Sequence, residues 1–325
     1  MKVFPWIINV ELTNLCNLKC IFCDHPVLKK TMDLGYMGDQ ILHKMLGDVK
    51  ALGLNESIHE LGLVGLGEPT MDRHLSEHLE LIAPYAHLFN RISFNSNLVP
   101  LNGQRAELLL GSAINVYTFS INSSNRKAYL QTMGKDRYRE VIRNLKQFLE
   151  IRNQVGARSE VNIQVFESTN STLEELLRDF PDNYDDKVNF FTRKVYNKPV
   201  IQDGTDLVEI YRPCTLKRHP CWDIYTRIYI DREGYLYPCT VGNDCYRSDS
   251  ELCLGNLMDA SLDALFNNER IKQARARAEQ GKLPFPQCEK CNIWALTPNN
   301  FTWKPGEQRW RKKKSVLRAY DLHQE

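Results

Sequence analysis

The sequence lacks three features: a long apolar run, a strong net charge and a secretion signal. No window approaches the roughly 18 uncharged apolar residues that a membrane span requires. The opening residues, MKVFPWIINVEL, are too few and become acidic too early for a signal peptide. The 42 basic and 40 acidic side chains leave a net charge of only +2, so no overall field favours nucleic acid or acidic lipid. These absences argue against membrane contact and predict a cytoplasmic globular protein.

One basic segment, RWRKKKSVLR at residues 309–318, is the local exception. A short run of this kind is also typical of a solvated or fraying chain end. We therefore expect no nucleic-acid partner, and we assign residues 301–325 to a basic C-terminal tail.

The first two thirds of the chain alternate between short β-rich runs and amphipathic helical patterns, and 42% of all residues are apolar, which is enough for a sizeable core. Six runs are strand candidates: WIINVEL, LGLVGL, RISFN, VYTFSI, VNIQVF and VNFFT. Strand-helix repetition builds a parallel sheet with functional loops at the carboxyl ends of the strands. The pattern predicts an α/β fold, a partial (β/α)6 TIM-type barrel over residues 1–205.

After residue 205 the pattern changes. TRIYIDREGYLYPC alternates like a hairpin around an Asp-Arg-Glu-Gly turn, and residues 259–281 then read as one helix that Gly281 ends. The sequence QCEKC follows. Residues 206–300 are therefore predicted to form a small α+β domain.

Three cysteines, Cys16, Cys20 and Cys23, follow the first strand candidate within the stretch CNLKCIFC. In a chain without a secretion signal, cysteines favour metal binding or catalysis over disulfides. Structural zinc is one alternative, but zinc prefers four ligands and the next cysteine is Cys214. A bacterial ferredoxin run would need another cysteine nearby, and buried free thiols are a further alternative.

The C-x3-C-x2-C spacing, with Phe22 before the third cysteine, resembles the signature of the radical S-adenosylmethionine (radical SAM) superfamily. The resemblance implies a [4Fe-4S] cluster held by three thiolates, whose fourth iron chelates SAM. Reduction of the cluster then yields a 5′-deoxyadenosyl radical that abstracts hydrogen from the substrate. Such an enzyme needs a flavodoxin- or ferredoxin-type reductant and a cavity that excludes water.

The stretch GLGEPT at residues 65–70 resembles the Gly-Gly-Glu-Pro loop of the same superfamily, with Leu66 between the two glycines. The resemblance implies that Gly67 and Glu68, followed by Pro69, meet the methionyl ammonium of SAM. A carboxylate beside backbone acceptors suits a cation. Read alone, the glycines need serve only a tight turn.

Other cofactor residues are implied at later strand ends, again by resemblance. Asn95 lies in an Asn-rich turn, Ser120 and Asn122 are candidates for the ribose hydroxyls or the methionyl carboxylate, and Ile163 is a candidate contact for adenine. Turn capping and plain core packing are the alternatives for these residues. Arg193 at the sixth strand end is a candidate for orienting a polar substrate, with a solvated side chain as the alternative.

A second set of cysteines comprises Cys221, Cys239, Cys288 and Cys291. The hairpin brings the first two together, and the C-x2-C pair after the helix completes four thiolates. The order resembles the SPASM or shorter twitch extensions of radical SAM enzymes, especially in aminocyclitol dehydrogenases, and implies an auxiliary [4Fe-4S] cluster. Structural zinc is the alternative. A cluster with four thiolates has no open iron, so its expected task is electron transfer.

Three cysteines remain, Cys214, Cys245 and Cys253. Spare thiols are often small buried hydrophobes. The functional alternative is a catalytic thiol that returns a hydrogen atom to a substrate radical and so inverts a stereocentre, as in radical SAM epimerases of sugars and aminoglycosides. We rank Cys245 first, followed by Cys253 and Cys214.

The sequence thus predicts a radical SAM oxidoreductase or epimerase acting on an unactivated C–H bond of a sugar, aminocyclitol or aminoglycoside. Only fifteen residues precede Cys16, so we expect no leader-binding winged helix of the kind found in peptide maturases. Maturation of a ribosomal peptide is the second hypothesis. A non-catalytic iron-sulfur or zinc-binding protein is a third, from another class.

Overall fold

The protein was analysed as a computed structural model. It describes residues 3–54, 58–166, 171–180, 186–193, 220–239, 247–289 and 291, together with the backbone of two strands at 301–304 and 309–312. Within these ranges, none of the helices combines the length and apolar character that a membrane span requires.

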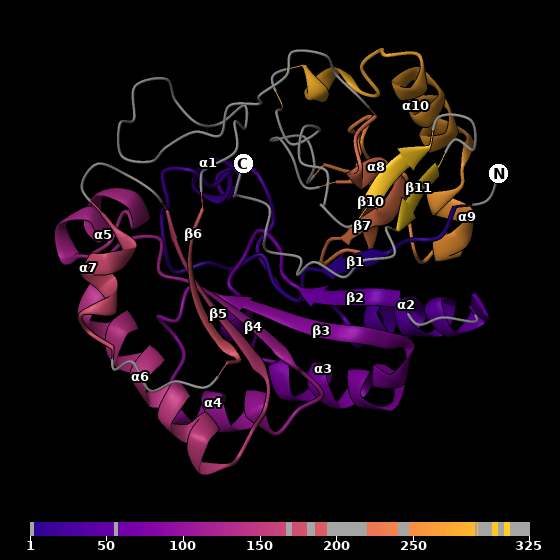
Figure 1. The fold of residues 1–325 in the computed structure, drawn as a ribbon. Coiled ribbons are helices and arrows are strands. Elements are labelled where there is room, and N and C mark those ends of the chain that lie inside the picture. The colour runs from indigo at the N-terminus through magenta and orange to yellow at the C-terminus, as the bar shows by residue number, and fades with distance from the viewer. Residues whose placement is uncertain are drawn as a thin grey trace.

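All six predicted strands are present, and they form the parallel part of one curved sheet (Figure 1). They are β1 (Ile7–Val10), β2 (Ile58–Leu63), β3 (Phe89–Ser96), β4 (Val116–Ser120), β5 (Glu160–Phe166) and β6 (Val188–Arg193). Each strand pairs in parallel with the next along the chain. This arrangement confirms the prediction of a partial barrel. The fold forms because β-branched and aromatic runs alternate with amphipathic helices along the chain.

Helices cover the outer side of this sheet. The larger ones are α2 (Asp39–Ala51), α3 (Leu75–Ile82), α4 (Gly103–Leu110) and α6 (Tyr138–Gln154), and the shorter ones are α5 (Arg126–Met133) and α7 (Leu173–Leu177). The short helix α1 (His25–Leu28) lies instead beyond the carboxyl end of the strands (Figure 1). Three of these helices are capped at the N-terminus by a side chain that accepts a hydrogen bond from a backbone N–H group in the first turn. The capping residues of α4, α5 and α7 are Asn102, Asn125 and Thr172. These caps fix where each helix begins.

The two faces of the sheet differ in polarity. Phe119 of β4 lies beside Ile163 of β5, and the Phe119 ring contacts Phe148 of α6 with centroids 4.8 Å apart, so this face packs on the helices. The neighbouring positions Ser120 and Gln164 also pair and point into the barrel. An apolar outer face holds the layers together, while a polar inner face leaves a surface suited to a cofactor and a polar substrate.

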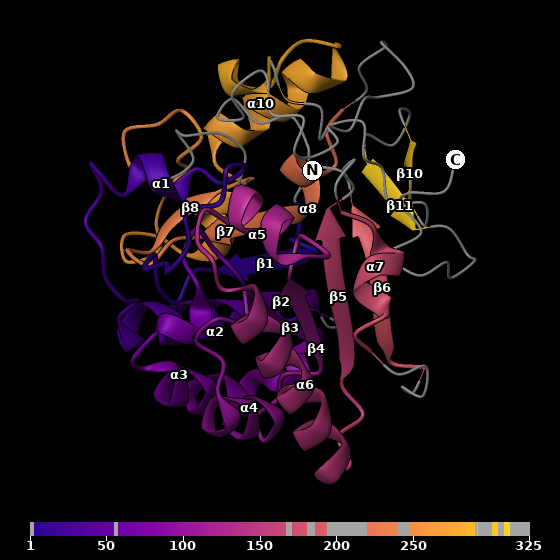
Figure 2. The same cartoon turned by 90° about the vertical axis from the view of Figure 1, so that its left-hand side faces the viewer.

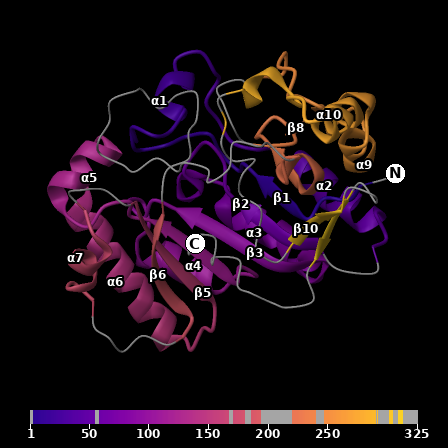
Figure 3. The same ribbon diagram turned by 45° about the horizontal axis from the view of Figure 1, so that its top comes forward.

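The C-terminal part continues the same sheet (Figure 2). Its elements are α8 (Asp223–Thr226), β7 (Arg227–Ile230), β8 (Tyr235–Tyr237), β9 (Gly255–Asn256), α9 (Leu262–Phe266) and α10 (Glu269–Glu279). β7 pairs in parallel with β1, and β8 and β9 add antiparallel strands, giving the order β6-β5-β4-β3-β2-β1-β7-β8-β9. The predicted small domain is therefore joined to the barrel by backbone hydrogen bonds. In Figure 3, α5 and α7 lie at one end of the sheet and α9 and α10 at the other.

The single helix predicted over 259–281 is wrong, because the chain forms two helices there. Asn268 adopts an extended conformation and caps α10 by accepting the N–H of Ile271. The side chain of Asn267 instead pairs with the backbone of Val3, which ties the N-terminal segment to the break. Two adjacent asparagines thus provide side-chain hydrogen bonds that compete with a continuous helix.

Two further predictions concern the domain boundary near residue 205 and the C-terminal tail at residues 301–325. The boundary expected near residue 205 lies outside the described residues. In the expected tail, β10 (Phe301–Lys304) and β11 (Arg309–Lys312) form an antiparallel pair, so part of the basic segment lies in a strand.

Candidate cluster and cofactor site

The loop with Cys16, Cys20 and Cys23 connects β1 to α1 at the carboxyl end of β1. The last turn of α5 holds it in place: the N–H of Lys19 donates to the carbonyl of Met133 at 3.2 Å, and the N–H of Ile21 donates to that of Thr132 at 3.0 Å. At the other end of the loop, the His25 N–H donates to the Cys23 sulfur at 3.5 Å. These hydrogen bonds within the chain hold the backbone of the loop at both ends.

The three thiols of this loop lie close enough to influence one another electrostatically. Burial raises the pKa of Cys16 to about 12 and also raises the pKa of Cys20, and the neighbouring cysteines raise both further. Without a cation, these thiols stay protonated at neutral pH. A metal cluster supplies the positive charge that converts them to thiolates, so the donor set fits such a group.

No three Cys, His, Asp or Glu side chains in the described ranges are arranged to hold a single metal ion. Cys16, Cys20 and Cys23 are half-buried free thiols, and Cys20 is close enough to the other two for their charges to raise its pKa.

A row of polar and sulfur side chains leads from the cysteine loop across the barrel mouth. The Cys20 sulfur lies 3.7 Å from the Met133 sulfur, which is also 3.7 Å from the side-chain nitrogen of Asn122. Gln164 donates to the Asn122 oxygen at 2.8 Å and accepts from Arg193 at 3.0 Å. The predicted residues Asn122 and Arg193 thus belong to one network. Gln164, which links them, was missed, because the alternation of β5 gives two faces without showing which one points inward.

Phe22 lies at the end of β5. Its ring meets the ring of Phe166 edge to face, with centroids 4.6 Å apart. This contact closes the cysteine loop over the strand end and contributes an apolar wall to the site.

The loop at residues 65–70 packs directly on the cysteine loop. The N–H of Glu68 donates to the carbonyl of Leu15 at 2.8 Å. A Cβ added at Gly67 would meet the carbonyl oxygen of Thr13 and lie 2.7 Å from the Cα of Asn14. Only glycine allows so close an approach of the two backbones.

Glu68 is 3% exposed, and its carboxylate joins the loops that follow β2 and β3. It accepts hydrogen bonds from the N–H and the hydroxyl of Thr70, at 3.1 and 2.6 Å. It also accepts from the Ser96 hydroxyl at 2.8 Å and the Asn97 N–H at 2.7 Å. Burial raises its pKa, while these donors oppose the rise. Sequence reasoning did not find this loop-joining role, and the contact with a methionyl ammonium stays a prediction.

Pro69 begins a short 3-10 turn, Pro69–Met71, that the Glu68 side chain caps through the N–H of Thr70. Asn95 pairs with Thr118 and therefore shares the inward face with Ser120. Ile163 is different, because it shares the helix-packing face with Phe119. A side-chain contact between Ile163 and adenine does not fit this orientation, whereas its neighbour Gln164 points inward.

The second set of thiols lies in the C-terminal part. Burial raises the pKa of Cys221 well above its usual value, and Asp223, Cys239 and Cys291 raise it further. Cys288 ends a 3-10 turn, Pro286–Cys288, and its carbonyl accepts the N–H of Cys291 at 3.3 Å. The hairpin and the C-x2-C turn therefore bring these four predicted ligands to one region. As in the first set, buried neutral thiols suit a positively charged metal cluster.

Of the three remaining cysteines, only Cys253 is described. It is buried in the hydrophobic core next to Leu252 and Leu254, where burial raises its pKa. Cys214 and Cys245 lie outside the described residues. A hydrogen-donor role stays a prediction for all three.

Two family models match the chain. The model of the Radical SAM superfamily matches residues 10–180, and the SPASM model, an iron-sulfur cluster-binding domain, matches residues 221–292. The first match spans half of the chain. The chain belongs to the radical SAM superfamily. Membership implies SAM and a [4Fe-4S] cluster, and the SPASM domain implies an auxiliary iron-sulfur cluster.

Solved structures show the same fold. BtrN in complex with AdoMet and 2-DOIA has a TM-score of 0.59 and 16% identity, over 90% of this chain and 94% of BtrN. SuiB of Streptococcus suis bound to precursor peptide SuiA has a TM-score of 0.60 and 17% identity, over 90% and 71%. The AdoMet-bound anSMEcpe has a TM-score of 0.58 and 19% identity, over 90% and 88%. At these identities the likeness concerns the fold alone.

A curated relative is GTP 3′,8-cyclase of Synechocystis sp. (strain ATCC 27184 / PCC 6803 / Kazusa), which is 25% identical over 166 residues. The match spans 50% of this radical SAM chain and 46% of the cyclase.

Proposed function

We propose that this radical SAM protein abstracts hydrogen from an unactivated C–H bond of a small polar substrate of the sugar, aminocyclitol or aminoglycoside type, leading to dehydrogenation or epimerisation. The observation that carries the proposal is the polar row from Cys20 to Arg193 across the barrel mouth. Amide and guanidinium groups there suit hydroxyl or anionic groups of a substrate. When bound, the reduced cluster and SAM supply the 5′-deoxyadenosyl radical.

In this proposal Cys16, Cys20 and Cys23 hold the SAM cluster. The residues of this chain bind and orient the remaining groups: Gly67 permits close approach of the backbone, and the Glu68 carboxylate faces the methionyl ammonium. Asn95, Ser120 and Asn122 line the inward face for the polar part of SAM, and Phe22 helps to exclude water. Excluding water protects a reactive radical from stray hydrogen donors.

The four cysteines of the C-terminal part would hold the auxiliary cluster. Support comes from β7, which follows Cys221 in the chain and pairs with β1, the strand that leads into the cysteine loop. Such a cluster suits removal of an electron from a substrate radical. A flavodoxin- or ferredoxin-type protein is proposed as the external reductant, and a cytoplasmic location accords with ten cysteines that are kept reduced.

Peptide maturation is the second candidate. It is supported by the likeness of the fold to SuiB bound to its precursor peptide. BtrN, solved with AdoMet and 2-DOIA, gives matching support to a small-molecule substrate. The inward polar row favours the small molecule, because it offers several hydrogen-bonding groups that are held by one another.

The test is anaerobic reconstitution followed by measurement of iron, sulfide and zinc and by mass spectrometry of 5′-deoxyadenosine. Candidate sugars, aminocyclitols, aminoglycosides and peptides are compared as substrates. We expect iron and sulfide for two clusters, and 5′-deoxyadenosine that depends on reductant and is lost in Cys20→Ala. Stoichiometric zinc with intact SAM would support a non-catalytic zinc protein instead. Product from peptides alone would replace the small-molecule proposal with maturation.

A further inference from the structure

A buried carboxylate lies between the two parts of the chain. Glu11 follows β1, is 2% exposed and shares the inward side of the strand with Asn9. One of its oxygens, Oε2, accepts two hydrogen bonds: from the N–H of Leu66 at 2.6 Å and from the hydroxyl of Tyr229 at 2.5 Å. Leu66 belongs to the proposed SAM loop, whereas Tyr229 belongs to β7 of the C-terminal hairpin.

The fit around this carboxylate is tight. A Cβ added at Gly65 would lie 2.6 Å from Oε2 of Glu11. The side chain of Glu11 therefore occupies the space that an alanine at residue 65 would need. The Glu11 side chain therefore contacts the loop at residues 65–68 closely, while the Tyr229 hydroxyl contacts the same carboxylate from β7.

Hydrogen-bond donors surround the Glu11 carboxyl, and the nearby carboxyl of Asp231 disfavours its ionised form. The backbone N–H of Arg232 is a third donor, and the Asp231 carboxylate lies close enough to raise the pKa of Glu11. A buried carboxylate in such surroundings costs free energy. An apolar side chain would fill the space at lower cost but would accept neither hydrogen bond. The geometry therefore points to a role that depends on the two acceptor contacts.

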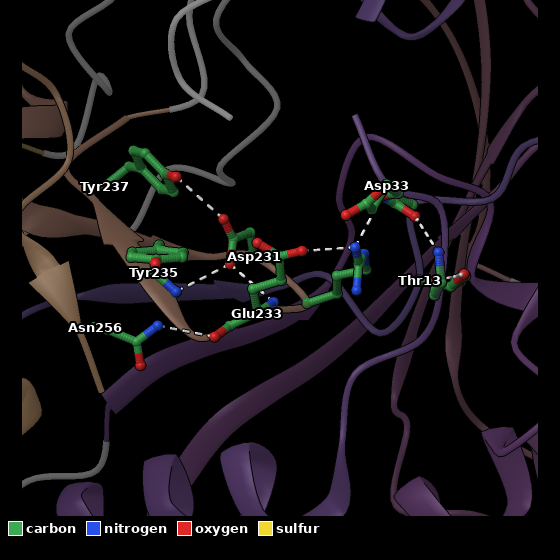
Figure 4. Close-up of polar contacts among 10 residues, drawn as sticks. Thr13, Asp33, Asp231, Glu233, Tyr235, Tyr237 and Asn256 are labelled. Atoms are coloured by element: carbon green, nitrogen blue, oxygen red, sulfur yellow. Dashed lines mark hydrogen bonds and ion pairs between the residues drawn. The ribbon is translucent and has the colours of Figure 1, made fainter. Parts of the chain in front are cut away.

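The same hairpin also forms a hydrogen bond with the segment that follows the cysteine loop (Figure 4). Asp231 accepts from the N–H groups of Glu233 and Tyr235, at 3.0 and 2.9 Å, and so fixes the hairpin turn. From this turn, the Arg232 guanidinium donates to the carbonyl of Asp33 at 2.9 Å. The hairpin thus contacts both chain segments that border the SAM site.

We infer that Glu11 is a positioning residue that couples the C-terminal hairpin to the loop at residues 65–68, so that the affinity for SAM depends on the hydroxyl of Tyr229. The inference rests on the proposed function of that loop. Tyr229 pairs with Asn9 in the β1–β7 register, and its hydroxyl donates to the same oxygen of Glu11 that accepts the N–H of Leu66 in the SAM loop. A change confined to the C-terminal hairpin should therefore alter a binding site in the barrel.

The test compares Tyr229→Phe with a matched control, Tyr225→Phe. Tyr225 is also buried, but its hydroxyl contacts Glu279 and the carbonyl of Arg275, both within the C-terminal part. SAM affinity is measured by equilibrium dialysis on the anaerobically reconstituted protein. We expect Tyr229→Phe to weaken SAM binding about tenfold, the size of one hydrogen bond to a charged group, and Tyr225→Phe to leave it unchanged.

A second pair of variants keeps the inference testable if a substitution disturbs folding. Glu11→Gln retains an oxygen that can accept both hydrogen bonds, so its SAM affinity should stay near that of the wild type. Glu11→Ala removes the acceptor, so its SAM affinity should fall. Hydrogen exchange in the reconstituted protein without SAM should be faster for residues 62–68 in Tyr229→Phe and unchanged in Tyr225→Phe.

Equal SAM affinity and equal exchange in Tyr229→Phe and the wild type would overturn the coupling. The same holds if Glu11→Ala binds SAM as tightly as Glu11→Gln. Failure of the proposed function is distinct, because then the wild-type protein itself binds no SAM while the exchange difference at residues 62–68 can still be measured.

Discussion

The sulfur atoms of Cys20 and Met133 lie 3.7 Å apart, which places the last turn of α5 against the loop of the predicted cluster ligands. The same turn accepts two backbone hydrogen bonds from that loop. α5 therefore acts as a support for the cysteine loop, and substitutions at its C-terminal end should affect assembly of the cluster before they affect chemistry.

Gly134, which ends α5, provides a direct test. It has a positive φ of 71°, and a Cβ there would lie 2.5 Å from the carbonyl oxygen of Lys19. Gly134→Ala should lower the free energy of unfolding by about 2 kcal/mol and reduce the iron bound after reconstitution, because the cysteine loop must move. Iron and sulfide analysis with thermal unfolding checks this.

Gly156→Ala is the control for that variant. Gly156 has a similar φ of 65°, but no atom lies within 4 Å of an added Cβ. Gly156→Ala should therefore lose stability only through the unfavourable backbone conformation of alanine. Equal iron content in the two variants would show that the contact between α5 and the cysteine loop does not shape the site.

Glu68→Gln tests whether the buried carboxylate binds the cofactor or only joins the loops that follow β2 and β3. An amide has one acceptor oxygen, so at least one of the donors from Thr70, Ser96 and Asn97 must face an NH2 group. We expect a loss of about 1–3 kcal/mol in unfolding free energy. If the carboxylate faces the methionyl ammonium as proposed, SAM affinity should also fall at least about tenfold, because the substitution removes its charge.

Ser96→Ala is the matched control, since it removes one donor and leaves the carboxylate in place. It should cost about 1 kcal/mol in stability with little effect on SAM binding. If Glu68→Gln loses stability but binds SAM normally, Glu68 joins the loops and does not contact the cofactor.

The strands and the cysteine sets could be predicted because their signals are local. Alternation and spacing are carried by a few neighbouring residues, as in VNIQVF and CNLKCIFC. The inward face of β5 could not be assigned, because apolar residues fill many barrel interiors, whereas here Gln164 points inward and Ile163 packs on the helices. Alternation gives two faces but does not say which one meets the cofactor.

Other features depend on contacts between distant segments. The pairing of β7 with β1 joins residues more than two hundred positions apart, and the Glu68 hydrogen bonds join the loops after β2 and β3. The break between α9 and α10 depends on Asn267 meeting Val3 at the other end of the chain. Such contacts cannot be predicted from one stretch of sequence, because each residue involved is also compatible with the local structure of its own segment.

Glu11 should make stability depend on pH. Burial, with Asp231 nearby, raises its pKa from 4.5 to about 7, while Tyr229 and the N–H groups of Leu66 and Arg232 oppose the rise. The folded protein therefore holds a proton that the unfolded chain has lost between pH 4.5 and 7. This contribution is complete below pH 4.5 and is lost as the pH rises through 7.

Glu11→Gln cannot titrate, so its stability relative to the wild type should increase with pH. The difference in unfolding free energy should grow by about 3 kcal/mol between pH 4.5 and pH 8. Urea unfolding at both pH values measures it, with the exposed Glu150→Gln on α6 as control. A difference that is constant with pH would show that Glu11 titrates normally in the folded protein.

Cys288→Ala separates the two proposed clusters. It removes one predicted ligand of the auxiliary cluster and leaves Cys16, Cys20 and Cys23 unchanged, so bound iron should fall by about half. Reductive cleavage of SAM should continue, because the first cluster is intact. Product should be lost if the reaction is a dehydrogenation, since the substrate radical must give up an electron. Cys253→Ala, which alters a buried core thiol, is the control for iron content.

Assays in deuterated water, with the wild type and three cysteine variants, distinguish dehydrogenation from epimerisation. An epimerase takes the returned hydrogen from an exchangeable thiol, so its product should carry solvent deuterium, and removal of the donor cysteine should divert the radical to shunt products. Cys245→Ala tests the first candidate and Cys253→Ala the second. Deuterium in the product, together with normal turnover in Cys288→Ala, would establish epimerisation. Loss of product in Cys288→Ala, with no deuterium in the wild-type product, would instead establish electron removal as the step that follows hydrogen abstraction.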